Sequence, residues 1–207
     1  MASLLIAFLV IALVPLFAAS WRMSLLGLSF QGLILGWIAW RVHGPVSLPV
    51  ILALVDLVLI RAIVAPRALH QVLSAHNAPR RNDVIPSNLF SWALVGGLVF
   101  VSFRFGTAIL KTDFANALHL ATATSALLLG MFVLSSQNSM FSQMVGLFRI
   151  ENAIALFELM SPHHFLIPIQ VGVSCVFLLT ILYFSRFLRG EMQYVSGSQP
   201  EDEGPTL

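Results

Sequence analysis

The stretch at residues 46–65, VSLPVILALVDLVLIRAIVA, decides the fold of this chain. Nearly all of its side chains are apolar, and a helix of about 20 such residues is long enough to cross the hydrocarbon core of a bilayer. Hydrophobic residues make up 58% of the 207 residues and charged residues only 10%, whereas soluble domains are about a quarter charged. The composition predicts an all-α polytopic membrane protein and excludes a soluble enzyme or a nucleic-acid reader.

Six further apolar stretches have the same character, so we predict about seven transmembrane helices. They lie at residues 3–20, 23–40, 46–65, 89–110, 115–135, 140–160 and 164–188. The first could be mistaken for a signal peptide, but no basic residue precedes its apolar run, and we keep it as a helix. The fourth contains Arg104, which lies near enough to its end to snorkel to the headgroups.

The chain is predicted to form a single transmembrane domain over residues 1–190. The only long connection, residues 66–88, is polar, and its first part, 67–76, is expected to be a helical extension at the membrane interface. Residues 191–207 contain the acidic run EDE at 201–203 among glycine, serine and proline. This composition predicts a disordered cytoplasmic tail.

The placement of basic residues predicts the orientation. In the seven-helix layout, the first and third loops and the C-terminus share one side, and the basic residues divide unequally between the two sides. One side carries Arg22, Arg67, Arg80, Arg81, Arg186 and Arg189, and the other carries Arg41, Arg104 and Lys111. Because cytoplasmic loops are enriched in basic residues, we predict a cytoplasmic C-terminus and an N-terminus outside.

A shift of the chain against itself by 119 residues aligns two landmarks. Residues 27–28 (GL) fall on residues 146–147 (GL), and residues 48–50 (LPV) fall on residues 167–169 (IPI). The shift predicts a parallel three-helix repeat, of the kind that many transporters contain, with halves at 1–66 and 115–190 and a connector helix at 89–110. The alternative is that glycine and proline recur by chance in apolar sequence.

Charges in the middle of predicted spans indicate function, because a central Asp or Arg costs about 2.5–3.5 kcal/mol on insertion scales. Asp56 and Arg61 lie in the third span, and Arg149, Glu151 and Glu158 in the sixth. Two helical turns separate Glu151 from Glu158, so both should project from one face, about 10 Å apart along the axis. That distance suits a water-bridged proton relay. The relay requires carboxyl groups that can take up and release a proton.

The other deep polar residues have expected roles of their own. Asn152 adds an amide that could orient a water molecule beside the relay. Arg149 is two positions from Glu151 and should point elsewhere, toward a neighbouring helix. Asp56 and Arg61 are poorly placed for one another in an α-helix, because they are five residues apart. The alternative to a relay is a set of structural interhelix salt bridges, for instance Asp56 with Arg149.

The sequence predicts neither a cofactor nor a metal. No two histidines lie at depth in facing spans, as a pair of haem ligands would, and no Cys/His cluster has zinc or iron–sulfur spacing. The single cysteine, Cys175, lies in an apolar run. All six histidines are expected in solvated interfacial positions, and of these only His119 could extend a proton path.

Two neighbouring segments carry a resemblance to a known family. They are LSSQN at residues 134–138 and QMVGLFRIENA at residues 143–153. They resemble the E membrane subunit (HyfE) of Hyf-type energy-converting hydrogenases, which has a Ser-Gln-x-Asn turn, then Gln-x-x-Gly, then Glu-Asn in mid-helix. The last three helices of that family are related to NuoK of respiratory complex I and to MrpC of cation antiporters. The motif covers about 20 residues, whereas the helix layout resembles the family over most of the chain.

The resemblance implies a non-catalytic, multi-pass subunit of a complex I-like redox complex in the bacterial inner membrane, beside antiporter-like subunits. Glu151 would be the family's buried glutamate on the proton- or cation-translocating charged axis. Arg61 and Pro66 match the family's Lys-x-x-x-x-Pro, and arginine keeps the charge but hardly ever deprotonates. The last helix lacks the family's usual acidic residue, so either a second relay acid is Glu158 or Asp56, or this chain has only one relay acid.

Two other functions stay open. The chain could be a purely structural or assembly subunit that moves no ions. It could also be a self-sufficient small transporter, although its few polar residues leave little to bind a substrate.

Overall fold

The computed structural model describes residues 1–17, 20–43, 47–75, 89–137, 139–160 and 167–197. In chain order the elements are α1 (Ala2–Phe17), α2 (Trp21–His43), α3 (Leu48–Leu54), the π-helical segment η1 (Val55–Val64), α4 (Ala65–Ala75), α5 (Leu89–Ile109), α6 (Phe114–Ser136), α7 (Met140–Glu158) and α8 (Ile167–Gly197). Over these ranges the chain is helical and contains no strand. The all-α prediction is confirmed for this part of the chain.

The helices coincide with the predicted apolar stretches. Because α3, η1 and α4 follow one another without a break, the described ranges hold seven continuous helices. Among the described residues, four helices are long and apolar enough to cross a membrane: α2, the joined helix over Leu48–Ser74, α5 and α6. Shorter apolar helices lie at Ala2–Leu13 and Val171–Phe187. The chain is therefore a helical membrane protein, and the count of seven spans stays a prediction.

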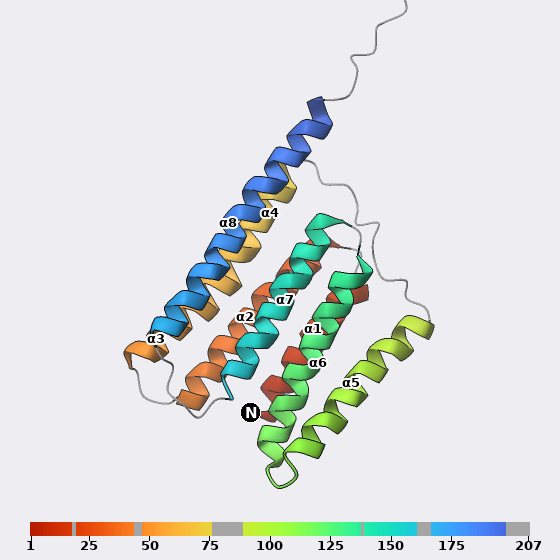
Figure 1. Cartoon of the computed structure of the whole chain (residues 1–207), viewed down its shortest axis with the longest axis vertical. Coiled ribbons are helices and arrows are strands. Elements are labelled where there is room, and N and C mark those ends of the chain that lie inside the picture. Colours follow the sequence, from red (N-terminus) through yellow and green to blue (C-terminus); the bar gives the residue numbers. More distant parts are fainter. Residues whose placement is uncertain (18–19, 44–46, 76–88, 138, 161–166, 198–207) are drawn as a thin grey trace, which may run out of the picture.

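The helices form a bundle with α2 and α7 side by side near its centre (Figure 1). On one side, α2 contacts the joined helix α3–η1–α4, and α8 runs alongside that helix. On the other side, α6 packs against α7 and α1, and α5 lies outermost against α6. This arrangement places η1, the irregular middle of the joined helix, next to the two central helices.

Two apolar clusters hold the central helices together. The first joins α1, α2, η1, α6 and α7, and it includes the fully buried Phe8 and Leu156. The second joins α2, α4, α7 and α8, and in it the ring centroids of Phe148 and Phe177 are 5.1 Å apart. The participation of α1 confirms that the first apolar stretch is a helix of the bundle. The second cluster fixes α8 against α7, beside the charged residues described below.

Glycines allow α6 and α7 to pack closely. A Cβ atom on Gly146 would lie 3.2 Å from the backbone nitrogen of Leu134, and one on Gly130 would lie 3.2 Å from the backbone nitrogen of Ile150. Small residues at such positions let helix backbones approach each other within a membrane. The close packing holds α7 in a defined position between α6 and α2.

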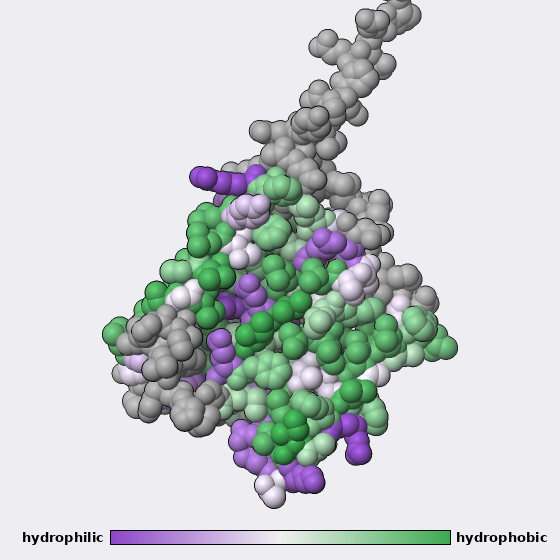
Figure 2. Space-filling view, in the orientation of Figure 1, coloured by the Kyte–Doolittle hydropathy of each residue, from purple (hydrophilic) through white to green (hydrophobic). Residues whose placement is uncertain are grey.

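Large apolar side chains cover much of the outside, and Figure 2 shows one such face, mostly in green. Exposed examples are Phe30, Trp37, Phe100, Phe105, Val176, Leu179 and Tyr183. Soluble monomers rarely expose contiguous apolar patches of more than a few hundred Å². In a chain with this composition, such a surface is suited to lipid or to neighbouring membrane subunits.

The structure corrects the predicted tail. α8 continues to Gly197, so the prediction of disorder from residue 191 is wrong for residues 191–197. Glu191, Met192 and Gln193 favour helix, and no proline lies between Pro168 and Pro200 to stop it. Residues 198–207 lie outside the described residues.

The predicted helical extension after the third span is confirmed as α4. Helix α4 continues along the axis of η1 and packs beside α8 (Figure 1). The rest of that connection, with Arg80 and Arg81, falls among residues 76–88, outside the described ranges.

The helix pairs α1 with α6, α2 with α7, and α3–η1 with α8 are in contact. The predicted repeat relates these same helices, but contact alone does not establish an internal repeat, which stays a prediction. The N-terminus and the end of α8 lie at opposite ends of the bundle (Figure 1). The side of the membrane on which each lies also stays a prediction.

Candidate functional site

The site begins with a buried ion pair on the joined helix. Nε of Arg61 donates a hydrogen bond to Oδ2 of Asp56 over 2.9 Å, and the two side chains are only 3% and 2% exposed. The expectation that these residues are poorly placed for one another is therefore wrong. It assumed an α-helix, but η1 is a π-helix, and its cap shows the wider turn, since the N–H of Ala65 bonds the carbonyl of Ile60. A repeat of i to i+5 places Arg61 over Asp56.

Helix α2 packs closely against η1 at this turn. A Cβ atom on Gly32 would lie 2.8 Å from the nitrogen of Ala62 and 2.9 Å from the carbonyl oxygen of Leu57. These two backbone groups are five residues apart, so α2 rests directly against the π turn. One turn further along α2, a Cβ atom on Gly36 would meet the side chain of Val58. Only glycine at position 32 permits this approach.

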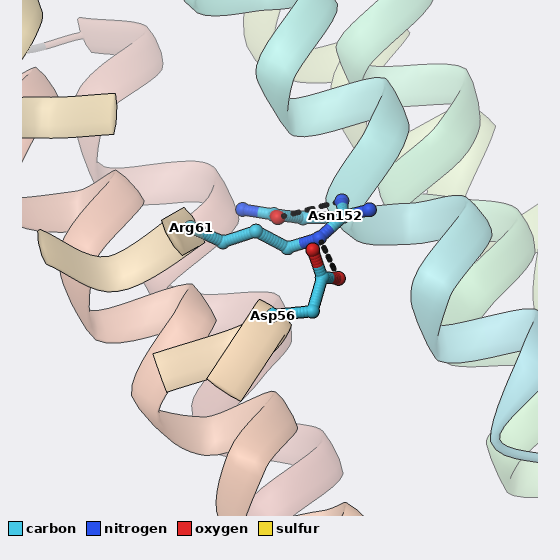
Figure 3. Close-up of polar contacts among 3 residues, drawn as sticks. All are labelled: Asp56, Arg61 and Asn152. Carbon is cyan, nitrogen blue, oxygen red and sulfur yellow. Dashed lines mark hydrogen bonds and ion pairs between the residues drawn. The ribbon is translucent and has the colours of Figure 1, made fainter. Parts of the chain in front are cut away.

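Arg61 also connects η1 to two other helices, and Figure 3 shows its contact with Asn152 on α7. Its Nη1 donates a long hydrogen bond of 3.5 Å to Oδ1 of Asn152 on α7. Its Cζ atom lies 4.4 Å from the ring centroid of Phe177 on α8. This distance is within the range of a cation–π interaction, and such an interaction is strongest when it is desolvated. The guanidinium is thus held by an anion, an amide and an aromatic face from three helices.

A pocket of about 440 Å³ opens beside Arg61, between α7 and α8. Glu151 and Glu158 both line it, together with apolar residues of the two helices that include the largely exposed Ile154 and Val176. The prediction that the two glutamates share one face of the helix is confirmed. The charges of Asp56 and Arg61 act on both carboxyl groups. The pocket therefore brings two carboxyl groups under the influence of one buried ion pair.

Several buried polar atoms at the site make no hydrogen bond to the described residues. Oδ1 of Asp56, Oε2 of Glu151 and Nδ2 of Asn152 are buried and have no hydrogen-bond partner among the described residues. Buried polar groups are normally hydrogen-bonded, and a water molecule in a polar cavity makes two to four such bonds. These atoms can accordingly bind water molecules in the interior of the bundle.

Arg149 and His119 lie outside the pocket, as far as its described lining extends. Arg149 is 4% exposed on α7, and the expectation that it points away from Glu151 stays a prediction. His119 is 6% exposed, and its Nε2 lies 3.0 Å from the carbonyl oxygen of Leu156. The expectation of a solvated interfacial position is wrong for His119, because the start of α6 packs against the last turns of α7.

No group of three or more His, Cys, Asp or Glu side chains that could hold a metal ion occurs among the described residues. The lone cysteine, Cys175, is exposed on α8.

Comparison with protein-family models, curated proteins and solved structures gives no match. The hydrogenase-subunit resemblance therefore stays a prediction that rests on residues 134–153, of which Asn138 lies outside the described residues.

Sequence reasoning missed two parts of the site. Gly32 and Gly36 form a G-x-x-x-G pattern, which is a known signal of close helix packing in membranes and could have identified the face that meets η1. Phe177 gave no such signal, because one aromatic residue in an apolar helix does not reveal what it packs against.

Proposed function

We propose that the chain is a non-catalytic membrane subunit of a complex I-like, energy-converting hydrogenase-type redox complex in the bacterial inner membrane. In this proposal Glu151 supplies a half-buried carboxyl group to the path along which protons or cations move, and antiporter-like subunits continue that path. The observation that carries the proposal is the shared pocket of Arg61, Glu151 and Glu158 beside the Asp56–Arg61 ion pair.

The chemistry of the site favours the glutamates as the groups that exchange protons. Arginine stays charged in proteins, and Arg61 already has a carboxylate partner in Asp56. Oε2 of Glu151 has no partner among the described residues. Arg61 then acts as a fixed positive charge, and Glu151 and Glu158 accept and release protons through water between them.

The position of the pocket supports the need for partner subunits. It opens at the outer surface between α7 and α8, where Ile154 and Val176 are exposed. A proton that reaches Glu151 along this side must continue into another polypeptide, because a continuous path through lipid is energetically prohibited for a charge. An adjoining antiporter-like subunit with its own polar path would complete the route.

The membership proposal is tested by purifying the tagged chain from native membranes in mild detergent and identifying the chains that accompany it. We expect antiporter-like membrane subunits together with a soluble arm that resembles a nickel–iron hydrogenase. Recovery of the chain alone, or with unrelated membrane proteins only, would contradict the proposal. An unrelated tagged membrane protein of similar abundance serves as the control for non-specific recovery.

The second candidate is a structural or assembly subunit that moves no ions. It is favoured by the Asp56–Arg61 pair, in which the buried charges neutralise each other within one helix, and by the glycine contacts between α6 and α7. This candidate predicts that Gly146→Leu disrupts the complex, whereas Glu151→Gln leaves ion movement unchanged. Gly97→Leu is the matched control, because a Cβ atom on Gly97 would meet nothing within 4 Å.

A further inference from the structure

A second pocket, of about 410 Å³, lies between the first turns of α2 and the region where η1 passes into α4. Its apolar lining includes Leu25, Ala62 and Pro66, and its polar lining includes Arg22, Arg67 and His70. The pocket does not include the Asp56–Arg61 pair or the glutamates. It is therefore a separate site with a chemistry of its own.

The charged side chains that line this pocket are all basic, as far as the described residues show. Two guanidinium groups and an imidazole line it, and none of the described residues that line it is acidic. Arg22 and Arg67 are exposed, so they are able to meet a ligand from outside the bundle. Guanidinium groups recognise phosphate through paired N–H donors. The polar part of the pocket therefore suits a phosphate-bearing ligand.

The apolar part of the pocket favours a phospholipid over a free phosphate ion. Two further lining residues, the exposed Leu26 and the half-buried Ile63, offer a hydrocarbon surface next to the arginines. A free phosphate ion uses the arginines alone, whereas a phospholipid uses both parts, with its phosphate at the arginines and its first acyl carbons on the apolar wall. Basic pockets between membrane helices are a recurrent site for anionic lipid headgroups.

We propose that this pocket binds an anionic phospholipid, with the headgroup at Arg22 and Arg67 and an acyl chain along the apolar wall at Leu26 and Ile63. The bound lipid would connect α2 to η1 and α4 at one end of the bundle. The end concerned is the one where α2 begins and α4 ends (Figure 1). The basic-residue count predicts that this end is cytoplasmic, where anionic lipids give the membrane surface its negative potential.

Native mass spectrometry of the full-length chain in detergent tests the proposal. Dioleoyl phosphatidylglycerol and dioleoyl phosphatidylcholine are added separately, and the bound fractions are compared. We expect tighter binding of phosphatidylglycerol. The double variant Arg22→Gln/Arg67→Gln should weaken that binding by about 30-fold, which corresponds to about 1 kcal/mol for each arginine. Arg41→Gln, at the opposite end of α2, is the matched control and should leave the binding unchanged.

Two further measurements separate the alternatives. Millimolar inorganic phosphate should displace little of the bound phosphatidylglycerol, and complete displacement would overturn the lipid assignment in favour of a free-anion site. Phosphatidylglycerol binding by the unmodified chain should fall at 1 M salt, because salt screens charges in exposed sites. Equal binding of the two lipids, or an undiminished affinity in the double variant, would also overturn the proposal.

Discussion

Replacing Arg61 with methionine is expected to lower the free energy of unfolding by about 3–5 kcal/mol, the usual penalty for removing one partner of a buried ion pair. Asp56 is 2% exposed and takes its hydrogen bond from Arg61, so the variant would leave a carboxylate in an apolar interior without its cation. Methionine retains much of the length of the side chain and its contact with Phe177. Reversible unfolding in mixed detergent micelles, followed by circular dichroism, measures the change.

The double variant Asp56→Leu/Arg61→Met distinguishes loss of the pair from loss of packing. Replacing both partners of a buried ion pair by apolar residues is often neutral or stabilising, so we expect the double variant to recover most of the stability lost by Arg61→Met. Arg104→Met, an exposed position on α5, should change the free energy of unfolding by less than about 0.5 kcal/mol. Additive losses in the double variant would show that Asp56 and Arg61 do not act as a pair.

Replacing Glu151 with glutamine is expected to reduce ion translocation by about tenfold or more while the complex still assembles. Glutamine keeps the shape of glutamate but has no proton to release, so it blocks a relay at the pocket of Arg61, Glu151 and Glu158. A tenfold loss corresponds to about 1.4 kcal/mol in the barrier. The measurement uses the purified complex in liposomes with a pH-sensitive dye, and subunit composition is determined on the same preparation.

A carboxyl group outside the pocket provides the control for this prediction. Asp113 accepts hydrogen bonds from Asn116 at the start of α6 and is exposed. Asp113→Asn keeps a good helix cap and should leave translocation unchanged. If Glu151→Gln translocates ions as fast as the unmodified complex, the relay role fails. If it loses subunits instead, Glu151 has a structural role in assembly.

The helices could be predicted from the sequence because each depends on a local property, namely the length of an apolar run. The common face of Glu151 and Glu158 could also be predicted, because α7 is a regular α-helix over that interval. The Asp56–Arg61 pair could not be predicted in this way. Its geometry depends on a π turn, and that turn is packed against Gly32 of another helix, so the relevant information is divided between two segments.

Two other features that the sequence did not predict depend on tertiary packing. The burial of His119 depends on the carbonyl of Leu156, and the cation–π contact of Arg61 depends on α8. Neither partner is adjacent in the sequence, and both contacts exist only once the bundle has formed. Periodicity identifies the face of a helix that carries the polar residues, but it does not identify the residue on the next helix that meets them.

The central claim, that the carboxyl group of Glu151 exchanges a proton, is tested most directly by infrared spectroscopy of the complex in lipid as the pH is changed. We predict a pH-dependent band of a protonated carboxyl group that is absent in Glu151→Gln and unchanged in Asp113→Asn. A spectrum in which Glu151→Gln removes no pH-dependent carboxyl band would show that Glu151 keeps one protonation state, and it would contradict the proposed role in ion translocation.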